Sequence, residues 1–184
     1  MNWEGLNPPY STIVADPPWP HHRGYSAMNE REGHGPLAPK AFSEMSPSDL
    51  MDLPVASLAG PNCALWLWST SSSLPVAFQV LQAWGFAYSQ ALVWSKKPMG
   101  CIPGGLFSQT VEFILLGRVG RAWWSKSVAN RSAFEWDRRR GHSTKPEGFR
   151  DLVEMASPGP YVELFARQPR LGWDSWGLGY EGVA

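Results

Sequence analysis

The stretch Ser11-Thr12-Ile13-Val14-Ala15-Asp16-Pro17-Pro18-Trp19 decides the fold of this chain. The segment 11–15 is short, β-branched and apolar, which predicts a buried strand that the two prolines terminate. We therefore expect Asp16 at the carboxyl end of that strand. In open α/β sheets ligands bind beyond such ends, so a site is expected there.

Strand and helix patterns alternate along the rest of the chain. Ser46 before Pro47 resembles a helix cap, and Thr144-x-x-Glu147 is a capping-box pattern that begins a helix running to about Ala156. This alternation predicts an α/β fold with a mostly parallel sheet and helices on both faces. Strands are predicted over 63–68, 86–94, 111–117 and 160–166, helices over 47–53 and 73–84, and a long loop over 20–45.

The composition indicates one globular domain over residues 1–184. Hydrophobic residues make up 43% and charged residues 17%, and we find neither a bilayer-spanning apolar run nor a signal peptide. Cys63 and Cys101 lie far apart and lack metal-ligand spacing, which favours an intracellular, cytoplasmic setting. The adjacent His21 and His22 lack further ligands at metal-binding spacing, so no metal is expected.

The charge is balanced overall but unevenly distributed. Sixteen basic and sixteen acidic residues cancel, whereas residues 118–150 hold nine Lys or Arg against three Asp or Glu, a local balance of +6. Such a stretch could follow the phosphates of a nucleic acid, or could be a solvated basic loop. The same two interpretations apply to Arg138, Arg139 and Arg140 as candidate phosphate contacts.

The segment Asp16-Pro17-Pro18-Trp19 offers the groups that methylation of adenine N6 requires. That amino nitrogen is a poor nucleophile because its lone pair is delocalised into the ring. The Asp16 carboxylate and the Pro17 carbonyl would each accept one amino hydrogen, and Trp19 would stack on the extruded base. Taken alone, the same four residues could form an ordinary turn whose tryptophan closes the core.

Motifs along nearly the whole chain resemble one family. The chain is similar to the MT-A70 family of adenine N6 methyltransferases, whose motifs occur here in the same order. The matching segments are 16–19 (Asp-Pro-Pro-Trp), 42–46 (Phe-Ser-Glu-Met-Ser), 65–68 (Leu-Trp-Leu-Trp), 84–86 (Trp-Gly-Phe), 93–96 (Val-Trp-Ser-Lys), Glu112, 142–146 (His-Ser-Thr-Lys-Pro), 163–167 (Glu-Leu-Phe-Ala-Arg) and 172–173 (Gly-Trp).

The resemblance implies a Rossmann-like class I methyltransferase fold in a permuted order, with the catalytic strand first and the cofactor-binding strand last. It also implies that Lys145 and Arg167 contact S-adenosylmethionine and that Asp16 faces the amino group of this cofactor. A surface lysine and a rim salt bridge are the alternatives for Lys145 and Arg167. The expected adenine side consists of Tyr25, Trp94, Lys96 and Glu112, where Glu112 either orients the base, balances Lys96 or is simply exposed.

The resulting hypothesis is an adenine-specific N6 methyltransferase that acts on nucleic acid, with DNA favoured over RNA. One alternative is a non-catalytic nucleic-acid-binding subunit, although such subunits lose the tetrapeptide that is intact at residues 16–19. Another is methylation of the N4 amino group of cytosine, which presents similar geometry. A homodimer or heterodimer stays open, and no membrane partner is expected.

Overall fold

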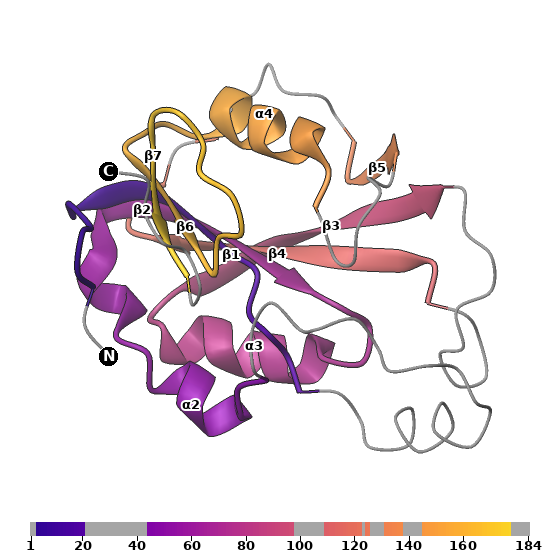
Figure 1. Ribbon diagram of the computed structural model, residues 1–184, viewed down its shortest axis with the longest axis horizontal. Coiled ribbons are helices and arrows are strands. Elements are labelled where there is room, and N and C mark those ends of the chain that lie inside the picture. The colour runs from indigo at the N-terminus through magenta and orange to yellow at the C-terminus, as the bar shows by residue number, and fades with distance from the viewer. Residues whose placement is uncertain are drawn as a thin grey trace.

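The computed structural model describes residues 3–20, 44–97, 109–122, 124–125, 131–137 and 145–177. These residues form a seven-stranded sheet with the order β5-β3-β4-β2-β1-β6-β7, which confirms the α/β prediction (Figure 1). The strands are β1 (Tyr10–Ala15), β2 (Ala59–Ser69), β3 (Ala87–Lys97), β4 (Val111–Val119), β5 (Ala133–Asp137), β6 (Tyr161–Leu164) and β7 (Trp173–Trp176); the helices are α2 (Pro47–Met51), η1 (Val55–Leu58, a 3-10 helix), α3 (Leu74–Ala83) and α4 (Glu147–Ala156).

One strand of this sheet runs against the others. β1 pairs in parallel with β2 on one side and with β6 on the other, and the pairs β6–β7 and β3–β5 are parallel too. β4 alone is antiparallel, to both β2 and β3. The sheet is therefore mostly parallel, as predicted, and the beginning of β4 lies at the edge where its neighbours end.

Helices cover both faces of the sheet. In Figure 1, α4 lies above the sheet, whereas α2 and α3 lie below it. The residues of β1 alternate between these two layers: Ile13 belongs to the apolar cluster that contains Val80 of α3, and Val14 belongs to the cluster that contains Phe149 of α4. A strand buried on both faces has a continuous apolar sequence such as that seen at residues 13–15.

Local signals in the sequence mark the start of α2 and the end of α3. The Ser46 hydroxyl caps α2 by accepting a hydrogen bond from Asp49 N–H at 3.1 Å, as predicted. α3 ends just before Gly85, whose φ of +82° is the left-handed conformation that glycine adopts at low cost. Within the described ranges, no helix has the length and apolarity that crossing a bilayer requires.

Three sequence predictions need correction. α4 begins at Glu147 with Pro146 at its N-cap position and without a side-chain cap, so the capping-box prediction is wrong; Thr144 itself lies outside the described residues. β2 is longer than the predicted 63–68: it begins at Ala59, which pairs with Tyr10 of β1, and ends at Ser69, which pairs with Phe113 of β4. The edge strands β5 and β7 were not predicted, and the predicted loop over 20–45 lies almost wholly outside the described residues.

Candidate active site

The first tetrapeptide residue lies where several strands meet. Asp16 follows the last residue of β1, and its N–H donates to the carbonyl of Leu164 at the end of β6 at 3.4 Å. Because β4 is reversed, Glu112 near its start lies opposite Trp94 near the end of β3. Side chains from the ends of three strands and the start of a fourth thus meet at one edge of the sheet.

In addition to the bond from Asp16 N–H, three hydrogen bonds hold the Asp-Pro-Pro-Trp segment. Trp19 N–H donates to the Pro17 carbonyl at 2.9 Å, and Met45 N–H donates to the Pro18 carbonyl at 3.0 Å. The indole of Trp19 donates to the carbonyl of Trp68 at 3.0 Å. A carbonyl oxygen has two lone pairs, so the Pro17 carbonyl can accept a second hydrogen bond from a substrate.

Trp19 itself packs in the core. Its exposed fraction is 8%, and it belongs to the same apolar cluster as Met45 and Leu67. Trp19 therefore closes the core, which was the alternative interpretation, and its stacking on an extruded base stays a prediction.

Four charged side chains form a continuous row beside the tetrapeptide. The ammonium of Lys145 lies 2.9 Å from Asp16 Oδ1 and 2.9 Å from Glu112 Oε2. The other oxygen of Glu112, Oε1, lies 2.5 Å from the ammonium of Lys96. Two negative and two positive charges therefore alternate in the order Asp16, Lys145, Glu112, Lys96. Of the three interpretations of Glu112, the structure supports the one in which this carboxylate balances Lys96.

The row sets the protonation of its members. Burial raises the pKa of Asp16 above its ordinary value, which the Lys145 ammonium opposes and the Glu112 carboxylate reinforces. Burial would also raise the pKa of Glu112, but Lys145 and Lys96 outweigh it, so that pKa is lowered. Burial lowers and the two carboxylates raise the pKa of Lys145, with a net rise. Glu112 and Lys145 are therefore firmly charged, while Asp16 is the member that takes up a proton most readily.

Aromatic rings lie under the charged row. Trp94 is 2% exposed, its indole donates to the Trp136 carbonyl at 3.0 Å, and its ring meets Trp68 edge to face at 5.8 Å. The Lys145 ammonium lies 4.8 Å from the centre of the Trp68 ring, and that of Lys96 lies 5.6 Å from the Trp94 ring. Trp68 and Trp94 therefore each stabilise one of the two cations, and the expected contact of Trp94 with adenine stays a prediction.

A pocket opens beside Asp16 between β6 and the start of α4. Its lining contains Lys145 and Arg167, the two predicted cofactor contacts, and also Phe165 at the end of β6. Arg167 is exposed and lines the same pocket as Asp16, and its positive charge opposes the rise in the pKa of Asp16 that burial causes. The structure thus brings Asp16, Lys145 and Arg167 together at one pocket, and their contact with S-adenosylmethionine stays a prediction.

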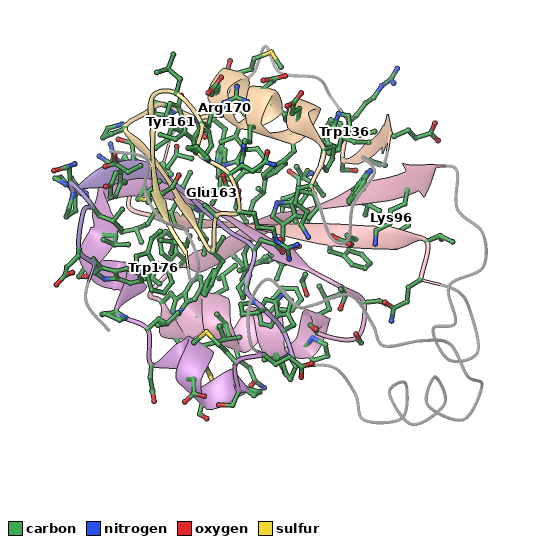
Figure 2. The ribbon with its side chains drawn as sticks, in the orientation of Figure 1. Lys96, Trp136, Tyr161, Glu163, Arg170 and Trp176 are labelled. Atoms are coloured by element: carbon green, nitrogen blue, oxygen red, sulfur yellow. The ribbon has the colours of Figure 1, made fainter. Side chains whose placement is uncertain are left out.

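The pocket also contains an ion pair between β6 and α4 that the sequence did not predict. Glu163 of β6 is 9% exposed, and its carboxylate lies 2.6 Å from the guanidinium of Arg150 of α4. Figure 2 shows Glu163 near the centre of the molecule, between the sheet and α4. Burial raises the pKa of Glu163, which Arg150 opposes and Asp16 reinforces. The available signal was a carboxylate inside an apolar strand, since buried charges need partners.

Four of the predicted substrate-binding residues fall in parts of the chain that are not described. Tyr25, Arg138, Arg139 and Arg140 lie outside the described residues.

The fold and the site together define the class of this protein. A mostly parallel Rossmann-like sheet carries the Asp-Pro-Pro-Trp turn at its carboxyl edge and a pocket beside it, which is the arrangement of a methyltransferase. The MT-A70 family model matches residues 10–179, and the chain belongs to the MT-A70 family.

Three named proteins are similar to this chain over nearly its whole length. The type II methyltransferase M.MunI of Mycoplasma sp is 29% identical over 181 residues, which is 92% of this chain and 77% of that protein. The N(6)-adenine-specific methyltransferase METTL4 of Homo sapiens is 26% identical over 185 residues, 91% of this chain and 37% of that protein. The N6-methyladenosine RNA methyltransferase MTA1 of Cryphonectria parasitica is 28% identical over 182 residues, 92% of this chain and 51% of that protein.

Proposed function

We propose that this protein transfers a methyl group from S-adenosylmethionine to the N6 amino group of adenine in a nucleic acid, with DNA favoured over RNA. The observation that carries this proposal is the position of Asp16. Its carboxylate follows the central strand β1, lines the pocket and is held by Lys145 at 2.9 Å, next to the Pro17 carbonyl.

The lining of the pocket suits this cofactor. The methionine end of S-adenosylmethionine carries both an ammonium and a carboxylate, so it needs partners of both signs. Asp16 and Glu163 offer carboxylates, and Lys145 and Arg167 offer cations. When bound, the cofactor supplies an electrophilic methyl group on a positively charged sulfur. We assign Asp16, Lys145 and Arg167 to its binding, with Glu163 added from the geometry.

The chain's own groups prepare the adenine nitrogen for attack. The Asp16 carboxylate accepts one amino hydrogen and the Pro17 carbonyl accepts the other, which favours a pyramidal nitrogen with a localised lone pair. As the nitrogen–carbon bond forms and the sulfur–carbon bond breaks, positive charge develops on the nitrogen. The Asp16 carboxylate stabilises this charge and takes the departing proton, which it passes to water.

The preference for DNA rests on the comparisons. M.MunI, of which this chain spans the largest share among the three relatives, is named a type II methyltransferase, whereas MTA1 is named an RNA methyltransferase. We assign Tyr25, Trp94, Lys96 and Glu112 to the adenine side, directly or through neighbouring groups. The cytoplasmic location and a dimeric assembly stay predictions, to be measured by cell fractionation and light scattering.

Methyl transfer is the direct test. Unmethylated DNA and RNA are each incubated with methyl-labelled S-adenosylmethionine and with the wild type or Asp16→Ala, and the labelled base is identified by mass spectrometry. We expect N6-methyladenine in DNA with the wild type only. Label in RNA or on cytosine N4 would change the substrate, and binding of cofactor and nucleic acid without any transfer would favour a non-catalytic subunit.

The basic segment before α4 is the proposed phosphate contact. Replacing Arg138, Arg139 and Arg140 together with Ala should weaken DNA binding and make it less dependent on salt, because fewer counterions are released on binding. Unchanged affinity and unchanged salt dependence would show that these arginines are a solvated loop.

A further inference from the structure

Two members of the charged row do not touch the proposed catalytic carboxylate. Lys96 near the end of β3 contacts Glu112 of β4, and Glu112 contacts Lys145, which contacts Asp16. The four side chains are between 10% and 16% exposed, so water screens them little. Figure 2 shows Lys96 far from Glu163, at the side of the sheet where β3 ends.

We propose that Lys96 and Glu112 are positioning residues which act through Lys145 to set the protonation and the orientation of Asp16, with Lys96 favouring the ionised carboxylate and Glu112 opposing it. Lys145 holds Oδ1 of Asp16, so Oδ2 can accept a hydrogen from the substrate amino group. The importance of this row for catalysis rests on the proposed function. Its effect on Asp16 is a property of the protein without substrate.

Asp16 and Glu112 share one ammonium group, that of Lys145. Lys145 lies at the same distance, 2.9 Å, from a carboxylate oxygen of Asp16 and of Glu112. Lys96 neutralises Glu112 from the other side, which leaves the attraction of Lys145 available to Asp16. Without Lys96, two carboxylates share one cation. A proton then relieves the excess negative charge, and Asp16 takes it because its pKa is already raised by burial.

Removing Glu112 has the opposite effect. Lys145 then interacts with Asp16 alone, and the carboxylate that repels Asp16 is gone, so Asp16 stays ionised to lower pH. The other charges that face Asp16 stay in place: Arg167 after β6, and Glu163 of β6 with its partner Arg150 of α4. Opposite shifts from two neighbouring substitutions distinguish this row from a purely structural role.

The test follows the side-chain carboxyl carbon of Asp16 by carbon-13 NMR in the protein without substrate, with the signal assigned by its loss in Asp16→Asn. Relative to the wild type, Lys96→Met should raise the titration midpoint of Asp16 by about one pH unit, and Glu112→Gln should lower it by about one unit. The double variant Lys96→Met/Glu112→Gln removes one charge of each sign and should return the midpoint close to the wild-type value.

Matched controls change the same charges elsewhere. Arg118→Gln removes a cation from the exposed far end of β4, and Glu154→Gln removes a carboxylate from a surface cluster with Arg170. Both should leave the midpoint of Asp16 unchanged. Lys96→Arg keeps the charge and should also keep the wild-type midpoint. If Lys96→Met does not fold, Lys96→Arg and Glu112→Gln still test the proposal. An Asp16 titration midpoint that does not move in Glu112→Gln would contradict it.

The kinetic arm uses the same variants. The acid limb of the pH dependence of kcat should move upward in Lys96→Met and downward in Glu112→Gln, with KM for DNA changing less than kcat. Shifts in the same direction in both variants, or a midpoint that neither variant moves, would overturn the proposal. If the wild type transfers no methyl group, the proposed function fails, while the NMR titration still decides whether the row controls Asp16.

Discussion

The indole nitrogen of Trp19 donates a hydrogen bond to the carbonyl oxygen of Trp68 at 3.0 Å, and this bond joins the Asp-Pro-Pro-Trp segment to the carboxyl end of β2. Trp19→Phe keeps an aromatic ring but leaves that buried carbonyl without this donor. We expect a loss of about 1–3 kcal/mol in the free energy of unfolding, measured by urea denaturation. Trp3→Phe is the control, because the indole of Trp3 makes a longer, exposed bond of 3.3 Å to the Pro54 carbonyl. An equal loss in both variants would contradict a special role for the Trp19 bond.

Asp16→Asn should make the protein inactive and, at neutral pH, more stable. Burial raises the pKa of Asp16 above its ordinary value of 3.8, so the folded state holds that proton more tightly than the unfolded chain does. The stability that this provides is complete below 3.8 and is lost as the pH rises through the raised pKa. Asparagine does not titrate and avoids this loss. Each unit of the shift is worth about 1.4 kcal/mol.

Thermal melting of both proteins from about pH 4 to about pH 8 checks this sign. The stability of Asp16→Asn relative to the wild type should increase with pH across that range. A relative stability that decreases with pH would mean that the ionised carboxylate stabilises the fold.

The pair Arg150 and Glu163 should show strong coupling in a double-mutant cycle. Arg150→Met leaves the carboxylate of Glu163 buried without the cation that lies 2.6 Å away, at an expected cost of about 3 kcal/mol. Glu163→Gln removes the charge and should cost much less. The double variant Arg150→Met/Glu163→Gln should lose about as much stability as Glu163→Gln alone. Arg170→Met is the control, since Arg170 pairs with more exposed carboxylates of Asp151 and Glu154 and should cost at most about 1 kcal/mol.

Gly177 should not tolerate a side chain. A Cβ atom there would lie 2.5 Å from the carbonyl oxygen of Ala166, beside the bond in which Ala166 N–H donates to the Trp176 carbonyl at 3.0 Å. Gly177→Ala should therefore destabilise the protein by about 1–3 kcal/mol and weaken cofactor binding, because Arg167 follows Ala166. Ser175→Ala, which adds no atom to β7, is the matched control. Wild-type melting and cofactor affinity in Gly177→Ala would show that this approach can relax.

Local patterns in the sequence were sufficient to predict the central strands of the sheet and the helices that pack on it. Residues 13–15 are continuously apolar because β1 is buried on both faces, and the Ser46 cap and the Gly85 stop are local signals with one structural meaning. β5 and β7 were missed because each is a short edge strand that pairs on one side only. The alternation of Phe134 and Trp136 in β5 was a usable signal.

The site was predicted as a set of residues but not as an arrangement. Asp16, Lys145 and Arg167 followed from the motif order, whereas the sharing of Lys145 between two carboxylates depends on the reversal of β4. Strand direction is a property of the whole sheet, which no local pattern contains. Glu163 and Arg150 form their contact between β6 and α4, so only the packed structure shows that they are partners.

The pairing of β1 with β6 also constrains how the protein is made. Thr12 pairs with Tyr161, so β1 is synthesised long before the strand that covers its second edge. Until then, the unpaired edge of an apolar strand is available to other chains. Contacts this distant in the chain also fold slowly. We therefore expect nascent chains that end before β6 to aggregate or to bind chaperones, and the pocket beside Asp16 to form only after β6 has been synthesised.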